Sequence, residues 1–99
     1  MANIVYQTAN INTPAIASST TALASNPKRK GWSIQNLGTN VLFVRLGTGA
    51  TTSIFHYCVK GGTGNDDGTG GSVSQTDGTV FTGEISIAGT SPRYAVMEM

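Results

Sequence analysis

The sequence predicts an all-β fold: an antiparallel β-sandwich or small jelly roll of roughly six to eight short strands, with an extended N-terminal arm. Three observations predict it. Short apolar runs recur at intervals of about 8–12 residues, separated by turn residues. Threonine, the commonest residue at 14 of 99, favours strands, whereas glycine (13), serine (9) and asparagine (7) favour turns. Charged residues make up only 11% of the chain, so the surface is built mostly from uncharged polar groups.

The N-terminal part is expected to form the extended arm. Residues 3–7 are a candidate for a short strand. Residues 8–26 carry no charge, are rich in alanine, serine and threonine, and contain Pro14, so we expect a polar arm with one or two weak strands. A helix over 15–24 is disfavoured because residues 18–21 are two serines and two threonines, which are poor helix formers in sequence.

A hairpin is expected between two apolar runs on either side of the turn residues 37–40. In the first run Trp32 and Ile34 alternate with polar residues, as in a half-buried strand. In the second run Leu42 and Val44 would meet Trp32 and Ile34 on one face of the hairpin. The two runs cover residues 31–36 and 41–46.

The next run, residues 53–60, has apolar residues on both faces, so we expect a strand buried on two sides. His56 and Cys58 would point to the same face of this strand, about 6.6–7 Å apart along it. That spacing strains the hydrogen bond that a thiol nucleophile needs from its base. We therefore expect a buried thiol and a hydrogen-bonded core histidine. The chain has no second cysteine or histidine for zinc, and no disulfide within one chain.

The rest of the chain is expected to hold a long glycine-rich loop and two more strands. The loop covers residues 61–72. Asp77-Gly78 is a hairpin-turn signal, and residues 80–87 and 93–99 alternate in the manner of strands.

The length fits one domain, residues 1–99. Leucine, isoleucine, valine and phenylalanine together are only 21 residues. At this size the free energy gained by burying apolar surface nearly cancels the cost of ordering the chain. We therefore expect the chain to be marginal alone and to associate with copies of itself or with a partner.

Other classes are excluded by composition. No apolar stretch approaches the 18 residues of a membrane span, and residues 1–10 do not have the pattern of a signal peptide. Six basic residues against five acidic ones argue against a broad nucleic-acid-binding face. The acidic residues show no spacing typical of a catalytic pair, and no glycine-rich phosphate loop is present, so we expect no enzyme activity and no cofactor.

Two acidic residues of the loop offer a possible calcium site. Residues 61–66 (GGTGND) match the start of a calcium-binding nonapeptide, in which carboxylates such as those of Asp66 and Asp67 supply oxygen ligands. However, Gly68 stands where the repeat needs a large apolar residue, and no second copy follows. We therefore expect a loop that is flexible or ordered by a partner rather than a metal centre.

Six residues are candidates for a partner interface. Lys28, Arg29 and Lys30 form the one cluster of basic residues, beside Trp32. They could grip an acidic protein surface or, less favourably, nucleic acid stacked on Trp32; alternatively they protect a sheet edge from unwanted pairing. Trp32 itself is expected in the core. The other three candidates lie in the loop: Asn65, Asp66 and Asp67.

One stretch of the chain carries a family resemblance. Residues 29–40 (RKGWSIQNLGTN) place a basic residue before an aliphatic strand and Ile-Gln-Asn-x-Gly, and residues 42–47 (LFVRLG) return as a second strand. With residues 59–71 and 87–94, this pattern resembles small structural proteins of tailed bacteriophage virions over about residues 28–94. The resemblance implies a β-sandwich that decorates or cements a head shell, or forms a small part of the tail, usually as a symmetric oligomer.

These arguments lead to a non-enzymatic virion structural protein as the expected function. It would be made in the host cytoplasm and then bind the major capsid protein as a homo-oligomer, expected to be a trimer. The alternatives are a host-recognition or carbohydrate-binding module of a tail fibre or spike, and a head–tail or tail subunit. An exposed Trp32 or Tyr57 would favour carbohydrate binding, whereas a buried Trp32 would disfavour it.

Overall fold

The computed structural model describes residues 7–12, 16–76 and 78–99, with side chains from Thr20 onward. In these ranges the chain forms eight strands and no helix. The strands are β1 (Gln7–Asn12), β2 (Ile16–Leu23), β3 (Gly31–Asn36), β4 (Leu42–Leu46), β5 (Tyr57–Val59), β6 (Ser72–Thr76), β7 (Ile85–Gly89) and β8 (Arg93–Glu98).

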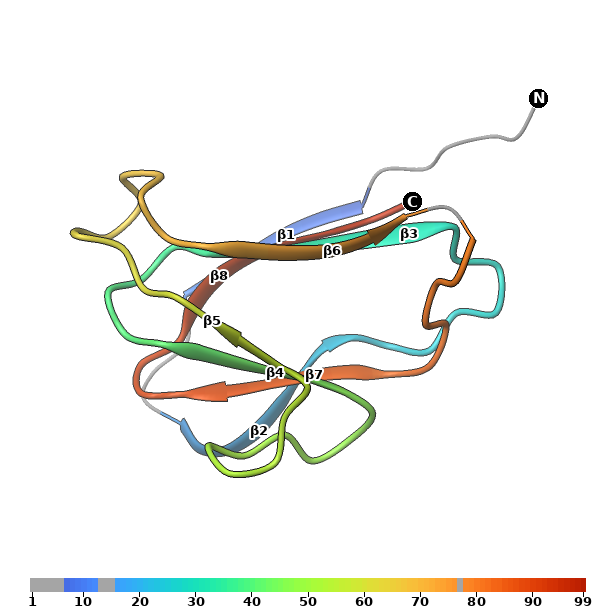
Figure 1. The fold of residues 1–99 in the computed structure, drawn as a ribbon, viewed down its shortest axis with the longest axis horizontal. Coiled ribbons are helices and arrows are strands. Elements are labelled where there is room, and N and C mark those ends of the chain that lie inside the picture. Colours follow the sequence, from blue (N-terminus) through green and yellow to red (C-terminus); the bar gives the residue numbers. More distant parts are fainter. Residues whose placement is uncertain (1–6, 13–15, 77) are drawn as a thin grey trace.

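The strands form two four-stranded antiparallel sheets that face each other (Figure 1). Sheet A has the order β1-β8-β3-β6, and sheet B has the order β2-β7-β4-β5. The chain forms one long antiparallel hairpin that turns back between β4 and β5. Its successive strand pairs are β1–β8, β2–β7, β3–β6 and β4–β5. Pairing of β8 with β3, and of β7 with β4, rolls this hairpin into two layers. This is the winding of a jelly roll, and the predicted fold class is confirmed.

The segment expected to carry one or two weak strands, residues 8–26, contains β2 and most of β1. β1 pairs with β8 from Gln7 opposite Glu98 to Asn12 opposite Arg93. β2 pairs with β7, with irregular register on both sides of Thr20 and Thr21. The disfavoured helix over 15–24 does not form along β2. Of the strand expected over 3–7, residues 3–6 lie outside the described residues, and Gln7 is the first residue of β1.

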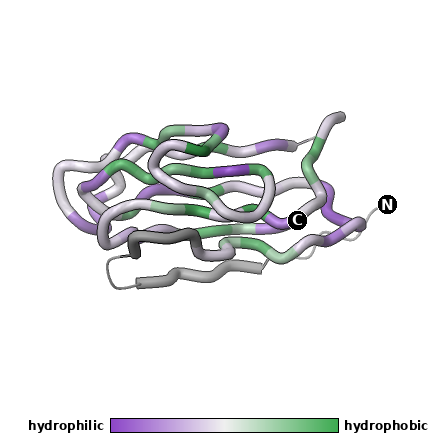
Figure 2. The backbone as a smooth tube through the Cα atoms, turned by 90° about the horizontal axis from the view of Figure 1, so that it is seen from below, coloured by the Kyte–Doolittle hydropathy of each residue, from purple (hydrophilic) through white to green (hydrophobic). Residues whose placement is uncertain are grey.

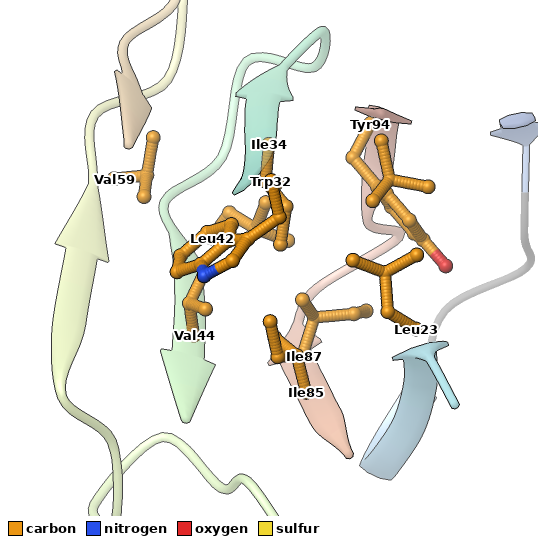
Figure 3. Close-up of a cluster of buried hydrophobic side chains, with 10 residues drawn as sticks. Leu23, Trp32, Ile34, Leu42, Val44, Val59, Ile85, Ile87 and Tyr94 are labelled. Atoms are coloured by element: carbon orange, nitrogen blue, oxygen red, sulfur yellow. The ribbon is translucent and has the colours of Figure 1, made fainter. Parts of the chain in front are cut away.

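The core lies between the two sheets and comes from the inward-facing residues of both (Figure 3). Figure 2 shows apolar and polar residues alternating along the chain, as strands with one buried face require. The solvent-accessible surface of the chain is 5516 Å², close to the roughly 5,300 Å² that size scaling gives for this mass. The ten buried residues of the core cluster are Leu23, Trp32, Ile34, Leu42, Val44, Val59, Ile85, Ile87, Tyr94 and Val96.

The predicted hairpin of the two central runs is wrong. β3 and β4 belong to different sheets, because both edges of β3 are already occupied by β6 and β8. The chain crosses between the sheets after the buried Asn36, whose amide group donates to the carbonyls of Asn40 (2.8 Å) and Val59 (3.1 Å) and whose oxygen accepts from the Gly38 amide (2.9 Å). The apolar residues of the two runs still pack together, but across the core between the two sheets (Figure 3).

The strand predicted over residues 53–60 is also wrong in extent and burial. Only Tyr57–Val59 is a strand, and it lies at the edge of sheet B, where one face is open to solvent. Residues 51–56 form turns instead, with the Thr51 hydroxyl accepting from the amides of Ser53 (3.1 Å) and Ile54 (2.9 Å). The turn therefore holds the apolar side chains of this segment outside the core.

The C-terminal part agrees with the sequence in only one of its two strands. β8 covers most of the predicted strand over 93–99, but the strand predicted over 80–87 begins only at Ile85 and continues to Gly89, with all five of its residues buried. The Asp77-Gly78 signal does not close a hairpin, since β6 pairs with β3 in sheet A while β7 lies in sheet B. Asp77 itself lies outside the described residues. Residues 80–84 precede β7 without strand structure.

Candidate functional site

The glycine-rich loop of residues 61–72 is tied to one end of the sandwich, the left end in Figure 1. The amide of Gly62 donates to the carbonyl of Gly38 (2.8 Å), and the amide of Asp66 donates to that of Leu37 (2.8 Å). These bonds join the loop to the crossing between β3 and β4. The loop therefore has a defined conformation within the single chain.

Close backbone approach explains two of the glycines of this loop, Gly61 and Gly70. A Cβ atom on Gly61 would lie 2.3 Å from the carbonyl oxygen of Thr39, and one on Gly70 would lie 2.1 Å from that of Asn36. No real Cβ atom tolerates such a contact, so only glycine lets the loop lie against the crossing segment. These two glycines allow the loop to dock against the crossing segment.

The two carboxylates of the loop have different partners. Asp66 adopts a left-handed backbone conformation (φ 58°) and forms a bidentate ion pair with the Arg93 guanidinium, 2.7 Å from its Nε atom. This hydrogen-bonded ion pair lowers the pKa of Asp66 and raises that of Arg93. A cation at Asp66 would have to displace the guanidinium.

Asp67 is held within the loop by hydroxyl groups. Its Oδ1 accepts from the Thr69 hydroxyl (2.6 Å) and amide (3.0 Å), and its Oδ2 accepts from the Thr63 hydroxyl (2.8 Å). The Thr69 hydroxyl, followed by the Thr69 amide and the Thr63 hydroxyl, lowers the pKa of Asp67. Asn65 beside them is exposed. Among the described residues no three histidine, cysteine or acidic side chains cluster as metal ligands.

The basic cluster is divided by the fold. Arg29 is buried at 4% exposure, and its guanidinium bonds Glu98 (2.8 Å) and the carbonyls of Ala24 (2.6 Å), Phe81 (2.9 Å) and Gly83 (2.9 Å). It joins the segment before β3, the segment before β7 and the end of β8. Arg29 therefore has an internal role in this chain, which local sequence does not indicate because three of its four partners lie more than 50 residues away along the chain.

Lys28 and Lys30 remain exposed on either side of Arg29. A shallow cavity of about 420 Å³ lies beside them, lined by Arg29, Lys30, Gly78, Val80 and Thr82. Because the Arg29 guanidinium is already bonded to Glu98, the free positive charge of this cavity comes from Lys30. With one free positive charge, this cavity would bind an anion only weakly.

The six predicted interface residues do not form one continuous surface. Three of them lie in the loop, and of the other three Arg29 is buried.

His56 and Cys58 are exposed, so the prediction of a buried thiol and a core histidine is wrong. Both lie at the solvent edge of sheet B because β5 is an edge strand there. His56 accepts a hydrogen bond from the Leu46 amide at its Nδ1 atom (3.0 Å). This bond ties the turn before β5 to the end of β4.

Trp32 is fully buried, as predicted. Its Nε1 donates to Oε1 of Gln75 (3.0 Å), an atom that also accepts from the Phe81 amide (2.9 Å). The indole ring packs edge-on against Tyr57 with ring centroids 6.3 Å apart. The burial of Trp32 is the outcome that disfavours carbohydrate recognition through this residue.

An exposed apolar patch lies on the outer face of sheet B. We define the apolar patch as Phe43, Ile54 and Phe55. The rings of Phe43 and Phe55 are in contact, with centroids 4.8 Å apart, and Ile54 and Phe55 are 50% and 39% exposed. Val41, 40% exposed, lies two residues before Phe43. Sequence reasoning missed this patch because it placed residues 53–60 in the core; the apolar residues on both faces of that run were the available signal.

Comparisons with protein-family models, with curated proteins and with solved structures found no match. Within the described ranges no helix is long and apolar enough to cross a membrane. Three features of the chain itself bear on its function: the jelly-roll fold, the apolar patch and the edges of the two sheets.

Proposed function

We propose that this chain is a non-enzymatic structural protein of a virion, a capsid decoration or cement protein that binds the major capsid protein as a homo-oligomer. The observation that carries the proposal is the apolar patch. Grouped exposed apolar side chains are a common feature of protein interaction sites. Two aromatic rings in contact, with an exposed isoleucine beside them, are the kind of anchor that dominates the energetics of protein interfaces.

The fold and the sequence resemblance support the same proposal. Jelly rolls occur in viral capsid proteins and in lectins, so the winding is compatible with a virion role, although a fold alone does not define a function. The resemblance to phage structural proteins spans about residues 28–94, which include β3 to β7 and the patch. A trimer is the expected oligomer.

Decoration would act through repetition. A patch of three apolar side chains gives a modest contact, but identical contacts recur at every equivalent position of a shell. Binding to the assembled shell and not to its free subunits shifts the equilibrium toward the shell by linkage. Many weak contacts thereby raise the resistance of the head to internal pressure from packaged DNA.

The test is cosedimentation of the purified chain with empty head shells. We expect the natural chain to bind in a fixed ratio to the major capsid protein. The double variant Ile54→Ser with Phe55→Ser should lose at least ten-fold in affinity while its Trp32 emission stays that of the folded chain. Thr79→Ala, exposed at a distant turn, is the matched control and should bind normally. A natural chain that ignores the shells, or a double variant that binds equally well, would contradict the proposal.

A further inference from the structure

Strand β6 leaves one edge of sheet A open. It is the last strand of the order β1-β8-β3-β6, so among the described residues only its β3 side is paired (Figure 1). Its register with β3 is continuous from Gly31 opposite Thr76 to Gln35 opposite Ser72, without the irregularity seen between β2 and β7. β6 is therefore a regular, straight edge.

This edge has none of the usual protection. Folded proteins guard exposed edges with lysine, proline, bulges or very short strands. Residues 68–76 contain no charged residue and no proline, and β6 is five residues long. The other open edge on this side, β5, is only three residues long and is followed directly by Lys60. Of these two edges, β6 is the better suited to pair with another strand.

The backbone hydrogen bonds of β3 fix which groups of β6 are free. Gly31 exchanges both of its backbone bonds with Met99, on the β8 side of β3, and Asn36 donates to the carbonyl of Gly71 on the β6 side (2.9 Å). Since backbone groups alternate between the two neighbours of a strand, Trp32 and Ile34 also face β6. Their register partners, Gln75 and Val73, face β3 in turn.

It follows that Ser72, Ser74 and Thr76 direct their amides and carbonyls to the open edge. Their side chains are exposed, whereas Val73 packs against the core and Gln75 holds the Trp32 indole. The inward side chains thus fix the strand in place, and the outward ones are small hydroxyl-bearing groups that do not obstruct an approaching strand.

We propose that two copies of this chain pair antiparallel along β6, about a two-fold axis at Ser74. Ser74 then faces its own copy, and Ser72 faces Thr76 of the second copy on both sides of the axis. Three such pairs, each exchanging two bonds, give about six backbone hydrogen bonds. Sheet A of one copy and sheet A of the second copy then form one continuous eight-stranded sheet.

A second copy fits this edge better than a different chain would. The free groups are self-complementary about Ser74, and an isologous contact requires that the same surface serve both partners. The absence of charge over residues 68–76 removes the repulsion that identical charged edges would suffer. The proposal deepens the proposed function by naming the contact between copies, and it rests on that function only for its place in the virion.

We expect the pairing to be weak in free solution. One five-residue strand contributes only part of the roughly 1,200–2,000 Å² buried by a stable complex. We therefore expect a dissociation constant in the micromolar range, strengthened wherever a surface already holds two copies side by side. If other surfaces form the expected trimer, this contact would join trimers into even-numbered assemblies.

The test is sedimentation velocity from about 1 μM to 1 mM. The natural chain should pass from monomer to an even-numbered species. Ser74→Pro removes the central amide and should abolish that step, while Ser74→Ala keeps the amide and should preserve it. Failure of the natural chain to associate at 1 mM, or association by Ser74→Pro equal to that of the natural chain, would overturn the proposal.

A charge pair tests the position of the axis without relying on proline. Ser74→Lys and Ser74→Glu should each associate about two- to five-fold more weakly than the natural chain, because like charges meet at the axis. Mixing the two variants should restore association, since opposite charges then face each other. Mixing without recovery would contradict an axis at Ser74. Shell binding by a monomeric Ser74→Pro chain would show that the proposed function does not depend on this contact, so the two can fail separately.

Discussion

The Nε atom of Arg29 lies 2.8 Å from the Glu98 carboxylate, although the Arg29 side chain is fully buried and that of Glu98 is 12% exposed. This ion pair connects the segment before β3 with the end of β8. Three backbone carbonyls accept the other donated hydrogen bonds of the guanidinium, so the charge is compensated and well bonded. Breaking such a buried pair by removing one partner is far more costly than losing a surface pair.

We therefore predict that Arg29→Met lowers the free energy of unfolding by about 3 kcal/mol or more, because Glu98 and three carbonyls lose their partner. Lys30→Ala, at the exposed neighbour, should change it by less than about 0.5 kcal/mol. Urea titration followed by Trp32 fluorescence measures both. Equal effects of the two substitutions would show that Arg29 is a surface residue in solution.

The Tyr94 hydroxyl is buried and has no hydrogen-bond partner among the described residues. An unpaired buried hydroxyl costs free energy, so Tyr94→Phe should stabilise the fold by about 1 kcal/mol. Thermal unfolding at pH 7 checks this prediction, and a drop in stability would reveal a partner for the hydroxyl.

The same tyrosine gives a prediction at alkaline pH. Burial raises the pKa of Tyr94 above its ordinary value of 10.0, so the folded state holds this proton more tightly than the unfolded state does. Its contribution to stability is present below pH 10 and is lost as the pH rises from there through the folded-state pKa. The alkaline fall in stability should be shallower for Tyr94→Phe than for the natural chain, and identical profiles would count against the burial.

The docking of the glycine-rich loop can be tested at Gly70. Gly70→Ala places a methyl group against the Asn36 carbonyl and should destabilise the chain by roughly 2 kcal/mol or more. Gly38→Ala is the matched control at the same end of the sandwich, because its nearest neighbour would lie at an ordinary 3.4 Å. A Gly70→Ala chain as stable as the control would mean that the loop does not rest against β3 in solution.

The Asp66–Arg93 ion pair predicts a dependence on acid pH. Because Arg93 lowers the pKa of Asp66 below its ordinary value of 3.8, the stabilisation is fully present above that value and is lost as the pH falls through the folded-state pKa. Asp66→Asn keeps a residue that tolerates the left-handed conformation but removes the charge. The urea midpoint of the natural chain should exceed that of Asp66→Asn at pH 6, and the difference should vanish toward pH 2. If the difference in urea midpoint stayed the same from pH 6 to pH 2, it would come from packing and not from the ion pair.

Local patterns predicted the strands more reliably than their partners. The alternation of Trp32 with Ile34, and that along residues 93–99, identified β3 and β8 because one face of each strand is buried. The turn residues 37–40 did not indicate whether the flanking strands would pair or face each other. That choice depends on β6 and β8, which reach β3 from far along the chain and occupy both of its edges.

The candidate site was less predictable than the fold for the same reason. A basic triplet looks like a solvated surface in sequence, yet Arg29 is buried because its partners lie at residues 24, 81, 83 and 98. Likewise, the run containing Ile54 and Phe55 looks like core, but Thr51 turns the chain outward at the edge of a sheet. Whether these side chains are exposed depends on their neighbours in the folded chain and not on the local sequence.

The number of copies of this chain in purified particles of the virus that the proposal assigns it to tests the central claim most directly. Quantitative mass spectrometry of such particles gives the ratio of this chain to the major capsid protein. If the chain is a decoration protein, its copy number should match the number of equivalent positions on the shell. Its ratio to the major capsid protein should stay the same after the tails are removed. Absence from the particles, or only the few copies of a tail component, would contradict it.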